Sequence, residues 1–153
     1  MKRPSILTRR KTLSLSSLVA ASLSGCLGSI SMGSGPSIGK SNIEMRIKSG
    51  NKNGPILDKE RVELENISDD ELDLNQSTLE YEHGELYEFR ELQLQPGAEV
   101  YVTTTGDERA TMKSSPPIYV RGAGLDSLIL SNSSAKVSLI GPGGGTIIKK
   151  EVE

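Results

Sequence analysis

The residue types best suited to metal, redox or nucleophilic chemistry are scarce in this chain of 153 residues. It contains one cysteine, Cys26, and one histidine, His83. A disulfide framework and a zinc site built from Cys and His within one chain are therefore excluded. Cys26 ends an N-terminal segment typical of a targeting signal, so we do not expect a Cys/His catalytic pair. His83 precedes Gly84 in a predicted two-residue hairpin turn, where we expect it to be exposed.

Carboxylates are the other candidates for chemistry. Glu63 and Glu65 lie two residues apart, on one face of a strand, a spacing that could pair them for acid–base work. Neither has a nucleophile nearby in sequence, so we predict that both are exposed polar residues of a strand. The acidic run Asp69–Asp73 could bind calcium, but it lacks the ligand spacing and central glycine of a calcium loop. We interpret it as a solvated acidic face, and we predict no catalytic residue, metal or cofactor.

Two further segments could hold an anion. The run Gly141–Gly145 is followed by a predicted strand, whereas a phosphate-binding loop needs a helix at that point, so we predict a hairpin turn. Arg109 and Lys113 lie in a predicted polar loop, 106–117, which we interpret as surface variation in preference to a recognition loop. Nucleic acid is not expected as a partner, because phosphate contacts need clustered Lys and Arg.

The charge of the chain is divided between two parts. The first 25 residues carry five basic residues and no acid, while the rest carries 13 basic and 20 acidic residues, a net charge of −7. The basic start and the short apolar run Leu13–Leu23 are the layout of an export signal, too short and polar to span a bilayer. Arg9-Arg10 resembles the twin-arginine export motif. Thr12 departs from that motif, so the ordinary secretory route stays open.

The end of this segment predicts a lipid anchor. Leu23-Ser24-Gly25-Cys26 resembles a lipobox, in which small residues before the cleaved bond fit a narrow peptidase site and the thiol sulfur takes the lipid. We therefore predict that Cys26 is the attachment site, with membrane lipid as its partner. The expected location is the cell membrane, facing the outside. Together with the acidic remainder, the two motifs resemble lipoproteins of halophilic archaea, because acidic surfaces stay hydrated in strong salt.

The rest of the chain divides into a tether and a domain. We predict a signal peptide over residues 1–25, a flexible Gly/Ser-rich tether over 26–41 and a folded domain over 42–153. Alternation of apolar and polar residues in the domain predicts short strands. They are expected at or around 43–48, 62–64, 72–74, 79–81, 86–89, 92–94, 100–102, 118–120, 125–130, 135–140 and 146–150.

These strands predict an all-β fold. No stretch has helical periodicity over three turns, and turn signals recur every few residues, which favours an antiparallel β-sandwich. We expect it to be monomeric. Its buried residues should include Leu64, Leu79, Val100, Leu128 and Leu139.

Several short motifs, in order and spacing, resemble the lamin-tail domain over roughly residues 59–150. They are Val62–Asn66, Leu72–Leu74, Thr78-Leu79, Tyr87–Phe89, Leu94–Val100, Ser131-Asn132 and Val137–Gly144 with Thr146–Ile148. The resemblance implies an immunoglobulin-like sandwich used as a scaffold for interaction, with catalysis supplied by other modules.

We therefore expect a non-enzymatic binding or structural module displayed at the surface and anchored at Cys26, with an unidentified protein or polymer partner. The alternative is an accessory lipoprotein that captures a solute or polymer beside a transporter or an exported nuclease. A large concave pocket would favour the alternative, and flat faces would favour the first interpretation.

Overall fold

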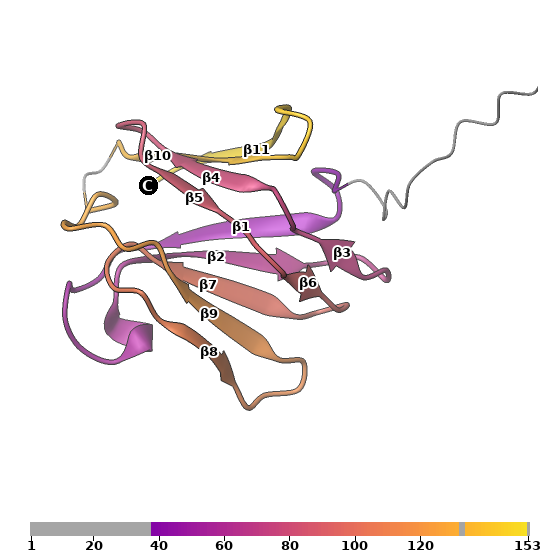
Figure 1. The fold of residues 1–153 in the computed structure, drawn as a ribbon, viewed down its shortest axis with the longest axis horizontal. Helices are drawn as coiled ribbons and strands as arrows, with labels where there is room; N and C mark the ends of the chain where they lie inside the picture. The colour runs from indigo at the N-terminus through magenta and orange to yellow at the C-terminus, as the bar shows by residue number, and fades with distance from the viewer. Residues whose placement is uncertain (1–37, 132–133, 153) are drawn as a thin grey trace, which may run out of the picture. The chain divides into compact units, whose positions relative to one another are not determined.

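The computed structural model describes residues 38–131 and 134–152, which form eleven strands and one short 3₁₀ helix (Figure 1). The predicted export motif at Arg9-Arg10, the lipobox with Cys26 and most of the tether lie outside the described residues. The elements are β1 (Ile43–Lys48), η1 (Ile56–Asp58), β2 (Arg61–Asn66), β3 (Leu72–Asp73), β4 (Thr78–Tyr81), β5 (Leu86–Glu88), β6 (Gln93–Leu94), β7 (Glu99–Thr103), β8 (Arg109–Met112), β9 (Ile118–Gly122), β10 (Lys136–Ile140) and β11 (Thr146–Glu151).

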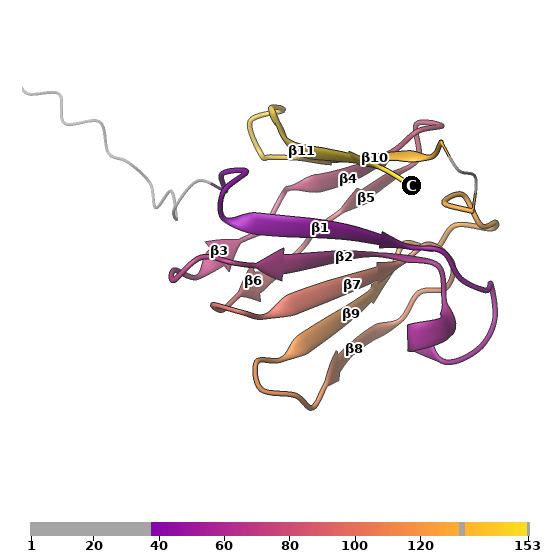
Figure 2. The ribbon, with the colours of Figure 1, turned by 180° about the vertical axis from the view of Figure 1, so that it is seen from behind.

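Two sheets stack to form the predicted β-sandwich (Figures 1 and 2). The larger sheet has the strand order β1-β2-β7-β9-β8, and the smaller one has the order β11-β10-β4-β5. A two-stranded ribbon of β3 and β6 completes the described part of the fold. An all-β sandwich agrees with the strand alternation in the sequence, because each sheet buries one apolar face against the other.

One strand pair departs from the antiparallel pattern. β7 and β9 run parallel, with Val100 opposite Tyr119 and Val102 opposite Arg121. The connection between them contains β8, which turns back and pairs antiparallel with β9. The prediction of a continuous polar loop over 106–117 was therefore wrong. β8 could not be predicted because it is an edge strand of four mostly exposed residues, and its alternation is limited to Ala110 and Met112.

Two glycines let the chain make this crossover tightly. A Cβ atom on Gly122 would lie 2.3 Å from the Gly106 carbonyl oxygen, so no larger residue fits there without movement. The backbone N–H of Gly122 donates to the Glu108 carbonyl at 2.7 Å, and that of Gly124 donates to the Gly106 carbonyl at 2.7 Å. Close backbone approach therefore locks the start of β8 against the end of β9.

The core consists of the alternate apolar residues of both sheets. Of the residues predicted to be buried, Leu64, Leu79, Val100 and Leu139 have no exposed surface. Leu128 is only half-buried, and its neighbours Ile129 and Leu130 are buried in its place. The predicted strand over 125–130 was wrong: this segment is a loop, so its side chains do not follow strand alternation. At the N-terminal end Ile38, inside the predicted tether, packs against the core.

The turns lie at the predicted positions, and one hairpin loop is longer than predicted. Gly97 has φ +73° in the turn Gln95–Ala98, closed by the Ala98 N–H donating to the Gln95 carbonyl, the geometry that a Pro-Gly pair favours. Gly141–Gly145 closes the β10–β11 hairpin as predicted. The β4–β5 hairpin has three loop residues, 82–84, and not the predicted two. The Tyr81 N–H donates to the Glu85 carbonyl, so these two residues still pair.

We expect Leu79→Ala to lower the free energy of unfolding by about 2–5 kcal/mol, because it leaves a cavity in the core. Leu86→Ala is the matched control, since Leu86 lies on the neighbouring strand β5 and is 61% exposed. Its effect should stay below about 1 kcal/mol. Urea unfolding followed by circular dichroism measures both values. Equal losses in the two variants would contradict this assignment of the core.

Candidate functional site

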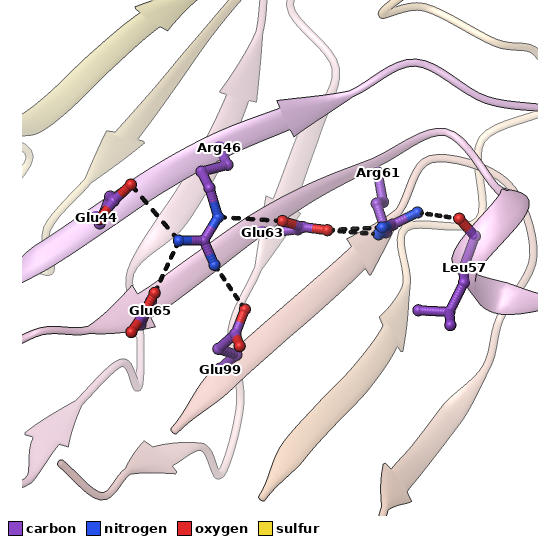
Figure 3. A network of polar contacts seen from close by, with 7 residues as sticks. All are labelled: Glu44, Arg46, Leu57, Arg61, Glu63, Glu65 and Glu99. Carbon is purple, nitrogen blue, oxygen red and sulfur yellow. Dashed lines mark hydrogen bonds and ion pairs between the residues drawn. The ribbon is translucent and has the colours of Figure 1, made fainter. Parts of the chain in front are cut away.

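The outer face of the larger sheet carries a network of charged side chains centred on Arg46 (Figure 3). Antiparallel pairing places Arg46 of β1 opposite Glu63 of β2, and places Glu65 of β2 between Glu44 and Glu99. The Arg46 guanidinium donates to Glu63 through Nε at 3.2 Å, to Glu65 through Nη1 at 2.8 Å and to Glu99 through Nη2 at 2.8 Å. One cation thus joins three strands through their side chains.

Glu63 is the buried member of this network. Its side chain is 5% exposed and that of Glu65 is half-buried, so the prediction that both are exposed strand residues was wrong. Arg46 binds its Oε2, while Arg61 binds its Oε1 through Nε at 2.9 Å and Nη2 at 2.7 Å. A buried carboxylate is tolerated when both oxygens are paired in this way. The long side chains around it provide the cover that a solvent-facing strand position ordinarily lacks.

Arg61 extends the network to the loop before β2. Its Nη1 donates to the Leu57 carbonyl at 2.6 Å and to the Lys59 carbonyl at 3.2 Å, which fixes η1 beside the sheet. Its guanidinium carbon lies 5.1 Å from the centroid of the Tyr101 ring, within the range of a cation–π interaction. Loop, strand and aromatic ring are therefore held by one side chain.

The electrostatics of the network keep Arg46 charged. Burial disfavours its cationic form, but hydrogen bonds to Glu65 and Glu63 and the charge of Glu99 outweigh burial and raise the pKa of Arg46. Burial, and then Glu99 and Glu63, also raise the pKa of Tyr101. The four glutamates and two arginines of the network leave an excess of negative charge on this face.

This arrangement suits recognition better than proton transfer. Glu63 and Glu65 do lie on one face, as predicted, but each accepts hydrogen bonds from a guanidinium that does not release protons near neutral pH. We refer to Glu44, Arg46, Glu63, Glu65 and Glu99 as the charged platform. It holds fixed charges at fixed positions on the outer face of the sheet, as a docking surface requires.

A second buried carboxylate, Glu60, was missed in the sequence analysis. It has no exposed surface and accepts hydrogen bonds from Thr104 Oγ1 at 2.9 Å, the Ile129 N–H at 2.7 Å and Ser131 Oγ at 2.6 Å. It therefore fastens the loop that replaces the predicted strand 125–130. A signal was present in the sequence: Glu60 has the same parity as Val62 and Leu64, which places it on the inward side of the strand that follows.

Glu108 forms a smaller junction beside the crossover. It accepts hydrogen bonds from Lys59 Nζ and, at 3.2 Å, from Thr103 Oγ1. Burial raises the pKa of Glu108, but the Lys59 hydrogen bond and charge, a backbone hydrogen bond and Thr103 outweigh burial, and the net pKa is lowered. This pair joins the segment before β2 to the start of β8.

The remaining predicted candidates do not converge. Asp69, Asp70 and Glu71 are exposed, in agreement with a solvated acidic face, and the half-buried Asp73 accepts the Asn75 N–H at 2.9 Å. His83 is exposed, as predicted. Arg109 belongs to β8, and Lys113 follows it on the surface. Within 38–131 and 134–152, no group of three or more His, Cys, Asp or Glu side chains is arranged to hold a metal ion.

Comparison with known proteins adds no assignment: no family model matches the chain, and no curated protein matches its sequence. Among the described residues, no helix is long and apolar enough to cross a membrane.

We expect Glu60→Ala to lower the free energy of unfolding by at least about 2 kcal/mol, because three donors inside the protein lose a charged acceptor. Glu71→Ala is the control: it removes an exposed carboxylate and should change stability by less than about 0.5 kcal/mol. Urea unfolding at pH 7 gives both values. A loss in Glu60→Ala as small as that of the control would show that Glu60 does not hold the loop.

Stability should also depend on Glu108 in acid. Because the folded pKa of Glu108 lies below its ordinary value of 4.5, its ionised form stabilises the fold above that value, and the contribution is lost as the pH falls through the folded pKa. Glu108→Gln should therefore lose less stability than the wild type between pH 7 and pH 3. Urea unfolding at a series of pH values tests this, with Glu71→Gln as the control. Parallel pH curves for Glu108→Gln and the wild type would contradict it.

Proposed function

We propose that this chain is a non-enzymatic binding or structural module, displayed outside the cell and anchored to the membrane by lipid at Cys26. The lipobox Leu23–Cys26 behind a basic and apolar segment is the observation that carries the anchor. Export through the twin-arginine route is part of the proposal, on the strength of Arg9-Arg10 and the weakly apolar run after them.

The sandwich supports the binding part of the proposal. The charged platform presents a surface on which three strands are cross-linked by Arg46. A rigid surface with fixed charges loses little conformational entropy when a partner docks, which favours specific association. The motifs shared with lamin-tail domains agree with a scaffold for interaction.

Two grooves on the described surface are open, which favours this proposal over an accessory protein that captures a solute. One groove of about 340 Å³ lies between β1 and β11, lined by residues such as Arg46, Lys48 and Lys150. Another of about 220 Å³ lies on the outer face of the smaller sheet and is lined by Glu80, Ser138 and Lys149 among others. Both are open and lined mainly by charged side chains, unlike the enclosed apolar pockets that bury small ligands.

The anchor can be tested by replacing its attachment atom. We expect the full chain, produced in a host that processes lipoboxes, to enter the detergent phase in a phase-partition assay, and Cys26→Ser to stay in the aqueous phase. Each buried CH₂ of an attached chain contributes about 0.8 kcal/mol, so two chains hold firmly. Ser34→Ala, in the predicted tether, is the control and should partition like the wild type. If the wild type itself stays in the aqueous phase, the proposed anchor is wrong.

A further inference from the structure

A second group of polar side chains lies at the other margin of the larger sheet, on β8 and β9. Arg109 and Arg121 are direct cross-strand partners. Tyr119 and Arg121 pair with Val100 and Val102 of β7, which are buried in the core, so their side chains start from the inner side of the sheet. Like charges placed opposite each other on one face destabilise a sheet, so this pair needs an explanation other than stability.

The two guanidinium groups have donors to spare. Arg121 uses Nη1 for the Val120 carbonyl at 2.8 Å and the Ala110 carbonyl at 3.3 Å. Within residues 38–131 and 134–152, its Nε and Nη2 have no hydrogen-bond partner. These two atoms form the edge of the guanidinium that binds carboxylates and phosphates through two parallel hydrogen bonds. Arg121 is half-buried, but these two atoms are accessible to solvent, so a ligand can reach them.

Two tyrosines complete the group. The guanidinium carbon of Arg121 lies 5.8 Å from the centroid of the Tyr119 ring. Tyr87 comes from β5, the edge of the smaller sheet, and its ring packs edge-on against Phe89 with the centroids 5.1 Å apart. Burial raises the pKa of Tyr87, and the charges of Arg121 and Arg109 offset only part of that rise. Burial and the charge of Arg109 lower the pKa of Arg121.

The one carboxylate paired with this group comes from its own chain. Among the described residues, Glu91 Oε2 accepts a hydrogen bond from Arg109 Nη2 at 3.2 Å. Its side chain is 87% exposed, and its backbone has a positive φ of 52°, which is uncommon for a residue other than glycine. The Glu91 carboxylate therefore binds the Arg109 guanidinium as a carboxylate ligand would. Among the described residues, no carboxylate binds Arg121.

We propose that Arg109 and Arg121, with Tyr119 beside them, form a binding site for an oxyanion, a carboxylate or phosphate group, carried by a ligand with a flat apolar part. The anion lies against the open edge of Arg121 and shares its charge with Arg109. The Tyr119 ring contacts the flat part of the ligand and excludes water from one side. This inference goes beyond the proposed function, because it stands whether or not Cys26 carries a lipid.

The site can be tested with simple anions on the full chain. Sodium acetate, benzoate and phosphate are titrated at a constant ionic strength made up with chloride, and the Arg Nε–H signals are followed by NMR. We expect the Arg121 signal to shift and saturate with the oxyanions but not with chloride. Tighter binding of benzoate than of acetate supports a carboxylate on a flat apolar body. Tightest binding of phosphate supports the site and assigns it to a phosphate group.

Variants separate the site from general charge effects. Arg121→Gln should weaken binding by about tenfold or more, since it removes the charged bidentate edge. Arg90→Gln is the matched control: Arg90 is 76% exposed and pairs only with Glu88 among the described residues, so its removal should change affinity by less than about twofold. Glu91→Gln should tighten binding by about two- to threefold, because a competing carboxylate is removed.

The gain in Glu91→Gln keeps the test valid even if Arg121→Gln folds poorly, because damage to the fold does not improve affinity. Shifts that grow linearly with every salt, chloride included, would overturn the proposal, since they report screening alone. Unchanged affinity in both Arg121→Gln and Glu91→Gln would overturn it as well. Neither result would bear on the lipid anchor, which the partition assay tests separately.

Discussion

The larger sheet depends on one constraint: β2 has to bury both of its faces. Val62 and Leu64 lie in the core, while Arg61 and Glu63 are covered on the outer face. Desolvating a carboxylate is unfavourable unless both its oxygens are paired. Arg46 from β1 and Arg61 from β2 itself supply those pairs, and this requires β1 to keep its register with β2. A slip of one residue would move Arg46 to the core side and leave Glu63 buried without its partner.

Much of the fold could be predicted because strand alternation is a local property. Ile43–Lys48 and Glu99–Thr103 alternate in sequence and are strands in the structure. The parallel pairing of β7 with β9 could not be predicted, because it depends on a crossover through β8, whose four residues Arg109–Met112 are mostly exposed. The opposite error occurred at residues 125–130, which are rich in leucine and isoleucine yet form a loop. Its buried apolar residues follow loop geometry, and Glu60 satisfies the Ile129 N–H that a neighbouring strand would otherwise bind.

The charged groups were harder to predict than the strands, for a physical reason. A glutamate on the polar side of a strand, such as Glu63, is ordinarily exposed, and only the register of β1 and β2 shows that two arginines cover it. Arg109 and Arg121 are 12 positions apart in the sequence and meet only through the β8–β9 hairpin. Glu60 differs from these, because its parity with Val62 and Leu64 is visible without any partner strand. The burial of a charged residue can thus be predicted from the sequence when the residue lies on the apolar side of its own strand. It cannot be predicted when side chains of a neighbouring strand cover the residue.

Salt affects these charged groups unequally, and the inequality matters for the binding surface that we propose. Exposed pairs such as Arg90–Glu88, 3.5 Å apart, are screened by dissolved ions and contribute little. Glu60 and Glu63 are held inside the protein, where ions do not enter, so their hydrogen bonds persist as the salt concentration rises. The sheet therefore keeps its geometry through buried charges, while the exposed carboxylates stay hydrated and keep the surface soluble. If the proposed partner binds in strong salt, its recognition depends on hydrogen bonds at fixed positions more than on long-range attraction. Arg46 fixes those positions by joining β1, β2 and β7.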